Sequence, residues 1–91
     1  MSERVPRKPP AALVDQWPDT PTSDPAGEAV RRFVVNLRDA LGDRSVRAVA
    51  RDAGLDERTI RHVMAGSVWP DLLTVSRLEH VLGVNLYPGT N

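Results

Sequence analysis

A segment near the middle of the sequence carries side chains that can recognise a partner through specific hydrogen bonds. A helix over residues 56–65 would turn Ile60, Val63 and Met64 inward, because they share one side at helical spacing. The polar residues on its outer side are Glu57, Arg58, Arg61 and His62. An Arg fork can donate to guanine, Glu can accept from cytosine, and His can do either. These residues fit contact with the edges of nucleic-acid bases, and the alternative is the solvated charged face of an ordinary surface helix.

Basic residues also precede this segment. A predicted helix begins after Ser45, and an outward stripe of arginines accompanies it: Arg44, Arg47 and Arg51. Ser is typical of a helix N-cap, where backbone N–H groups can bind a phosphate. The stripe therefore fits contacts with a phosphate backbone. For its last two members, surface ion pairs with Asp43 and Asp52 are the alternative.

The apolar residues that must position these side chains follow a helical period from Glu28 onward. The first predicted helix carries Val30, Phe33, Val34, Leu37 and Leu41 and stops at Gly42. The second carries Val46, Val49, Ala50 and Ala53 and stops at Gly54, and the third begins at the cap Asp56 and stops at Gly66. The fourth begins at the cap Asp71, carries Leu72, Val75, Leu78, Val81 and Leu82, and stops at Gly83. No segment alternates like a strand, so we predict an all-α domain of four to five helices over residues 28–87, with a short tail over 88–91.

Residues 1–27 have a different composition. Six of the eight prolines lie in residues 1–25, which excludes a long helix, and we expect a largely disordered arm. Two helical turns over residues 10–17 would place Leu13, Val14 and Trp17 on one side, as in a docking motif. The basic end of the arm consists of Arg4, Arg7 and Lys8 and can reach phosphates.

The overall composition excludes several classes of function. Lys and Arg together number 12, as do Asp and Glu, so the net charge is zero and bulk charge cannot drive binding to a polyanion. The absence of Cys and the presence of only 2 His leave no metal site, and we expect no cofactor. A triad of His62, Ser67 and Asp71 lacks a supporting context, so we predict that the protein is not an enzyme. Without an apolar run for a signal peptide or a membrane span, we expect a cytoplasmic protein.

The spacing of small and apolar residues between residues 45 and 84 resembles a known family. Ala50 permits a close helix approach, Gly54 permits a tight turn, and Leu55 fills the angle between the helices. With the loop Gly66-x-x-x-Pro70, this segment resembles the lambda-repressor and Cro type of helix-turn-helix domain (Xre family), over residues 30–86. The resemblance implies that Glu57, Arg58 and His62 contact bases and that Arg61 lies between base and backbone. Expected backbone contacts are Arg44, Ser45, Arg47, Arg51 and Ser67.

The sequence departs from the family at three places. Val46 stands where the second helix usually opens with Gln, and Met64 stands where Glu is common. The loop before Pro70 is Ser67-Val68-Trp69 rather than basic or amidic. We expect Met64 to fill the core and Trp69 to pack over the edge of the domain.

The predicted function is sequence-specific binding of double-stranded DNA by a transcriptional regulator, similar to a phage or prophage repressor. Helix 56–65 would enter the major groove, and a weak homodimer would bind a two-fold operator. The alternative is a protein-interaction module, antitoxin-like or an adaptor, whose protein partner binds Leu13–Trp17 and Val68–Trp69.

Overall fold

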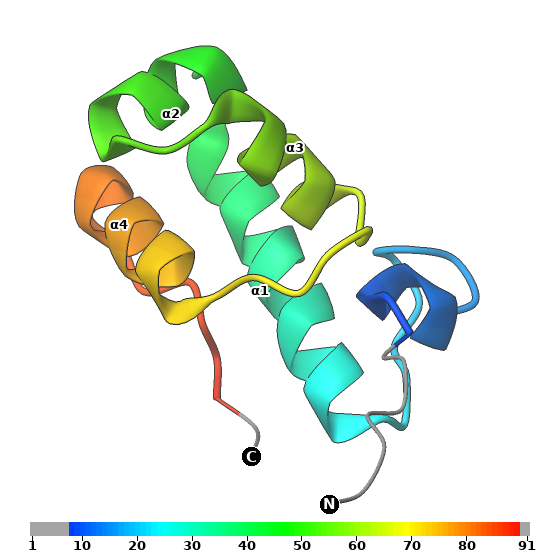
Figure 1. The fold of residues 1–91 in the computed structure, drawn as a ribbon. Helices are drawn as coiled ribbons and strands as arrows, with labels where there is room; N and C mark the ends of the chain where they lie inside the picture. The colour runs from blue at the N-terminus through cyan, green and yellow to red at the C-terminus, as the bar shows by residue number, and fades with distance from the viewer. Residues whose placement is uncertain (1–7, 90–91) are drawn as a thin grey trace, which may run out of the picture.

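The computed structural model describes residues 8–89, and this part of the chain is helical, without strands. A 3-10 helix η1 (Pro10–Leu13) precedes four α-helices: α1 (Pro25–Leu41), α2 (Val46–Ala53), α3 (Glu57–Met64) and α4 (Leu72–Leu82). Figure 1 shows the three shorter α-helices grouped along the long α1. The predicted all-α class is confirmed for the described residues.

Each α-helix is preceded by a polar residue whose side chain accepts a hydrogen bond from a backbone N–H of the first turn. These N-caps are Asp24, Ser45, Asp56 and Asp71, and the last three confirm the sequence prediction. The apolar period predicts α1 only from Glu28, but the helix begins at Pro25. It begins there because the Asp24 carboxylate accepts from the Gly27 N–H at 2.7 Å, and Pro at the first position has no N–H to leave unpaired.

Side chains from all four α-helices form a single hydrophobic core. Its fully buried members include Phe33 and Leu37 of α1, Ile60 of α3, Leu78 of α4, and Leu86 beyond the last helix. The prediction that Leu72 points inward is wrong, because Leu72 is 82% exposed. The buried side of α4 is centred between Thr74, Val75 and Leu78, and at about 100° per residue Leu72 lies well away from that centre.

The segment after α4 is held by side chains of α1 and α4. The Glu79 carboxylate accepts hydrogen bonds from the backbone N–H groups of Leu86 at 2.7 Å and Tyr87 at 2.9 Å. The Asn36 side-chain amide donates to the Leu86 carbonyl at 2.9 Å. These contacts keep Leu86 in the core without a further helix.

The largest difference from the sequence prediction concerns residues 8–24, which we call the N-terminal segment. The prediction of a largely disordered arm does not describe these residues, because Pro10 and Val14 are buried and η1 packs against α1. The predicted two helical turns over residues 10–17 are one 3-10 turn. Pro-rich composition prevents a long helix, but it does not prevent a short segment from burying its apolar side chains. Arg4 and Arg7 lie outside the described residues.

An ion pair on α1 binds the later part of the N-terminal segment to this helix. Arg31 donates to Glu28 at 2.7 Å and to the Pro18 carbonyl at 3.1 Å, while Glu28 also accepts from the Thr22 N–H at 3.1 Å. The hydrogen bond from Arg31, above all, lowers the pKa of Glu28 to about 2. The ionised pair therefore stabilises the connection between this segment and α1.

Candidate nucleic-acid interface

The position of α3 is set by a tight turn from α2. Gly54 ends α2 with φ of 68°, a left-handed conformation that Gly adopts without steric cost, and the Leu55 N–H donates to the Ala50 carbonyl at 2.9 Å. Arg77 of α4 donates to the Gly54 carbonyl at 3.0 Å. The turn is therefore held from two sides, by the end of α2 and by α4. The role of Arg77 was not predicted from the sequence, because nothing local connects residues 54 and 77.

The outer side of α3 presents most of the predicted base-contacting residues together. Ile60 and Val63 are buried and Met64 is half-buried, as predicted. The exposed ridge on the opposite side consists of Arg58, Arg61, His62 and Ala65. These four residues lie at helical spacing on two successive turns, so they can face one surface at the same time.

Glu57 is not part of the exposed ridge, and its carboxylate accepts hydrogen bonds from Arg61. The Nε and Nη2 groups of Arg61 both donate to one Glu57 carboxylate oxygen, at 2.8 and 2.7 Å. This pair is exposed, with 58% of the Arg61 side chain and 38% of the Glu57 side chain accessible, so it adds little to stability. The pair has a larger effect on side-chain geometry than on stability. The pair orients the guanidinium and leaves the second carboxylate oxygen of Glu57 without a hydrogen bond from the described residues.

The other arginines of this region divide into paired and unpaired groups. Arg51 is paired with Asp52 at 3.3 Å, as one of the sequence alternatives has it. Within residues 8–89, Arg44, Arg47 and Arg58 are all exposed and make no side-chain hydrogen bond or ion pair. Arg47 therefore does not pair with Asp43. The three unpaired guanidinium groups, one just before α2, one on α2 and one on α3, are local positive charges on a chain that is neutral as a whole.

The two predicted serines lie at the ends of the helix pair. The Ser45 hydroxyl caps α2 by accepting from the Ala48 N–H at 3.0 Å, and Ser45 is exposed. Ser67 is exposed just after α3, and its N–H donates to the His62 carbonyl at 3.0 Å. Ser67 thus lies at the opposite end of α3 from Glu57 and Arg58, which share a shallow depression with Arg61.

The C-terminal end of α3 is covered by the N-terminal segment, which was not predicted. The Trp17 indole N–H donates to the Met64 carbonyl at 2.8 Å, and the Ala11 N–H donates to the Gly66 carbonyl at 3.0 Å. A methyl group at Gly66 would lie 2.7 Å from Ala11 Cβ and 2.7 Å from Trp17 Cε2. This contact is therefore close enough to require Gly. The sequence pattern places Trp17 on the apolar side of a short segment but does not indicate which residue it contacts.

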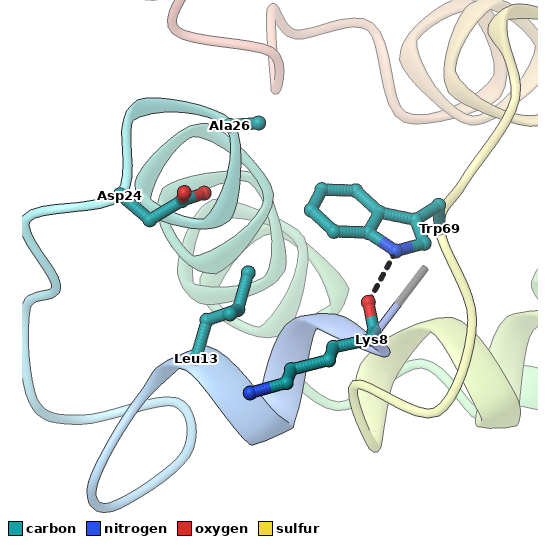
Figure 2. Close-up of a pocket in the computed structure, with 5 residues that line it drawn as sticks. All are labelled: Lys8, Leu13, Asp24, Ala26 and Trp69. Atoms are coloured by element: carbon teal, nitrogen blue, oxygen red, sulfur yellow. Dashed lines mark hydrogen bonds between the residues drawn. The ribbon is translucent and has the colours of Figure 1, made fainter. Parts of the chain in front are cut away.

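The loop after α3, the N-terminal segment and the start of α1 also border an open hollow. Figure 2 shows the Trp69 indole N–H donating to the Lys8 carbonyl, a bond of 2.8 Å. The hollow has a volume of about 480 Å³ and is lined by Lys8, Leu13, Asp24, Ala26 and Trp69. Leu13 and the Trp69 ring face it from opposite sides (Figure 2). Two segments singled out separately in the sequence, Leu13–Trp17 and Val68–Trp69, therefore meet at one place.

Comparison of the chain with models of protein families, with curated proteins and with solved structures gave no match. In the described part of the chain, no helix combines the length and apolarity needed to cross a membrane. Residues 8–89 also contain no group of three or more His, Asp or Glu side chains placed to hold a metal ion.

Proposed function

We propose that this chain is a sequence-specific regulator that binds double-stranded DNA with a helix-turn-helix domain of the lambda-repressor type. In this proposal α3 lies in the major groove and presents its exposed ridge to the base edges. The observation that carries the proposal is the ridge itself. Arg58, Arg61 and His62 face outward from a helix whose other side is fixed in the core and whose start is held by a tight turn.

The unpaired and paired arginines suggest different roles. Arg58 has both edges of its guanidinium available and suits a two-bond contact with guanine. Arg61 is oriented by Glu57, whose second carboxylate oxygen can accept from cytosine. We therefore expect G·C pairs under the start of α3. The proposed phosphate contacts are Arg44, Ser45, Arg47, Arg51 and Ser67, and Arg51 must leave or share Asp52 to make one.

The experiment compares variants on a duplex selected from a random pool and on a scrambled duplex at fixed salt. Arg58→Ala should cost about 1–3 kcal/mol on the selected duplex and should flatten the preference at one guanine. Arg32→Ala is the matched control, because it removes an exposed arginine of α1 that also makes no side-chain hydrogen bond or ion pair within residues 8–89. Equal losses for the two variants, or no loss for Arg58→Ala, would contradict the proposed role of α3.

Glu57→Ala separates a base contact from a surface charge. Removing a carboxylate near phosphates should raise affinity for scrambled DNA, while freeing Arg61 should lower the ratio between selected and scrambled DNA. Arg61→Ala should lower the same ratio without raising affinity for scrambled DNA. If Glu57→Ala leaves the ratio unchanged, Glu57 is a surface charge with no part in recognition.

The proposal includes a weak homodimer on a two-fold operator, with half-sites about one helical turn apart. Leu72 and Tyr87 are the kind of exposed apolar side chains that a second copy covers, at 82% and 48% exposure. Sedimentation on the selected duplex should show two copies per operator, and Leu72→Ser should weaken the binding of the second copy. A single copy on every duplex would contradict the dimer without affecting the role of α3.

One observation favours a second candidate function, that of a protein-interaction module. Leu13 and Trp69 line the same hollow, with Lys8 and Asp24 at its borders. An antitoxin-like or adaptor domain could hold an apolar side chain of its protein partner there. Capture of a defined partner without DNA, lost in Leu13→Asp but kept in Arg58→Ala, would support this function over DNA binding.

A further inference from the structure

The C-terminal end of α3 depends on a side chain from the N-terminal segment. We infer that Trp17 is a positioning residue for the exposed ridge, because its indole N–H holds the last carbonyl of α3. The effect on DNA recognition rests on the proposed function, whereas the hold on α3 does not.

The hydrogen bonds of the last turn show why one side chain matters here. The final carbonyls of an α-helix have no partner within the helix and must find one elsewhere. Three of the last four are satisfied by the chain that follows: Arg61 by the Ala65 N–H, His62 by the Ser67 N–H, and Val63 by the Gly66 N–H. The fourth, Met64, accepts from the Trp17 indole N–H at 2.8 Å, from a residue 47 positions away.

Packing around Gly66 reinforces this hydrogen bond. Gly66 has φ of 73°, and the Trp17 ring occupies the space that a side chain at Gly66 would need. The Ala11 N–H donates to the Gly66 carbonyl on the same side. The N-terminal segment thus meets the end of α3 through two hydrogen bonds and a direct ring contact.

The consequence concerns the second half of the ridge. His62 lies on the last turn of α3 and Ala65 is the C-cap directly after it, and α3 has only eight residues, Glu57–Met64. Its start is held by Asp56 and the turn at Gly54. Contacts with base edges need donor–acceptor distances within a few tenths of an ångström, so a loosened last turn lowers discrimination more than general affinity.

The two tryptophans allow a matched test. Each donates its indole N–H to a backbone carbonyl at 2.8 Å, Trp17 to Met64 at the end of α3 and Trp69 to Lys8 of the N-terminal segment. Trp17→Phe keeps an aromatic ring and removes the donor, and Trp69→Phe makes the same change at the control position. Two properties are measured: amide hydrogen exchange at residues 65–67, and the affinity ratio between the selected and the scrambled duplex.

Trp17→Phe should speed exchange at residues 65–67 by about fivefold to tenfold, as expected for the loss of one hydrogen bond. It should lower the affinity ratio by a similar factor while affinity for scrambled DNA stays within about twofold. Trp69→Phe should leave both properties within about twofold of the unchanged protein. If Trp17→Phe speeds exchange but leaves the affinity ratio unchanged, the positioning role is overturned. If Trp17→Phe leaves exchange unchanged, Trp17 does not stabilise the end of α3.

Failure of the proposed function gives a different result from failure of this inference. If the unchanged protein prefers no duplex, DNA recognition is refuted, while the exchange data still decide whether Trp17 holds α3. If Trp17→Phe does not fold, the unchanged protein supplies the test. Its Trp17 indole N–H and the amides of residues 65–67 should then exchange through one opening, with the same dependence on urea. If the exchange rates of the indole N–H and of these amides depend differently on urea, the inference is overturned.

Discussion

Replacing Gly66 with Ala tests the contact between the N-terminal segment and the end of α3. Gly83 provides the control, because both glycines follow a helix and have nearly the same positive φ, 73° and 69°. They differ in their surroundings. A methyl group at Gly83 would have no atom within 4 Å, whereas one at Gly66 would lie 2.7 Å from both Ala11 Cβ and Trp17 Cε2.

The expected magnitudes follow from this difference. Gly83→Ala should lower the free energy of unfolding by about 1–2 kcal/mol, the cost of a left-handed conformation for a residue with a Cβ. Gly66→Ala bears the same cost and must also displace the N-terminal segment, and such overpacking costs about 1–3 kcal/mol more. The difference between the two variants therefore isolates the packing. In a domain this small, the larger loss is a substantial part of the total stability.

The assay is urea unfolding followed by circular dichroism, with both variants measured against the unchanged chain. The double variant Gly66→Ala with Trp17→Ala should lose less than the sum of the single changes, because one of the two neighbours of the new methyl group, the Trp17 ring, is gone. If Gly66→Ala and Gly83→Ala destabilise equally, within about 0.5 kcal/mol, the N-terminal segment does not pack on the end of α3.

Three further predictions concern the ion pair, the core and the turn. The pKa of Glu28, about 2 in the folded chain, lies below its ordinary value of 4.5, so its pairing with Arg31 stabilises the fold above about pH 4.5 and this stabilisation is lost as the pH falls toward 2. Glu28→Gln should therefore lower Tm at pH 7 and flatten the decrease of Tm between pH 4.5 and 3 seen in thermal melts. Leu78→Ala should cost about 2–5 kcal/mol in urea unfolding because Leu78 is fully buried, whereas Leu72→Ala should cost less than about 0.5 kcal/mol, and equal costs would show that the face of α4 is misassigned. Arg77→Gln should cost about 0.5–1.5 kcal/mol through the lost hydrogen bond to the α2–α3 turn, and an unchanged urea midpoint would show that this bond does not hold the turn.

Features determined within a few residues could be predicted from the sequence. The caps at Ser45, Asp56 and Asp71 follow from side chains that reach N–H groups two or three positions ahead. The left-handed Gly54 follows in the same way from the end of one helical pattern and the start of the next. The pair between Glu57 and Arg61 could also be anticipated, because residues four apart on a helix are neighbours.

Features that join distant segments could not be predicted from local patterns. Trp17 donates a hydrogen bond to Met64, 47 positions away, and no period or motif in residues 1–27 indicates that contact. The phase of α4 was ambiguous for a different reason. Apolar residues at 72 and 73 sit beside the true inward residues, and only the packed neighbours decide which side of the helix is buried. For the candidate interface, residue types and helix face were therefore predictable, and the groups that hold the helix in place were not.

The most direct test of the proposed function is selection of bound sequences from a random duplex pool by the unchanged protein, followed by its affinity for the selected and a scrambled duplex. The proposal predicts that the pool converges on a sequence with G·C pairs and that the selected duplex binds about 10³-fold or more tightly at the same salt concentration. Affinity for scrambled DNA should fall steeply with added salt, as expected when phosphate contacts dominate it. A pool that stays random, or an affinity ratio near one at every salt concentration, would contradict the assignment of α3 as a DNA-recognition helix.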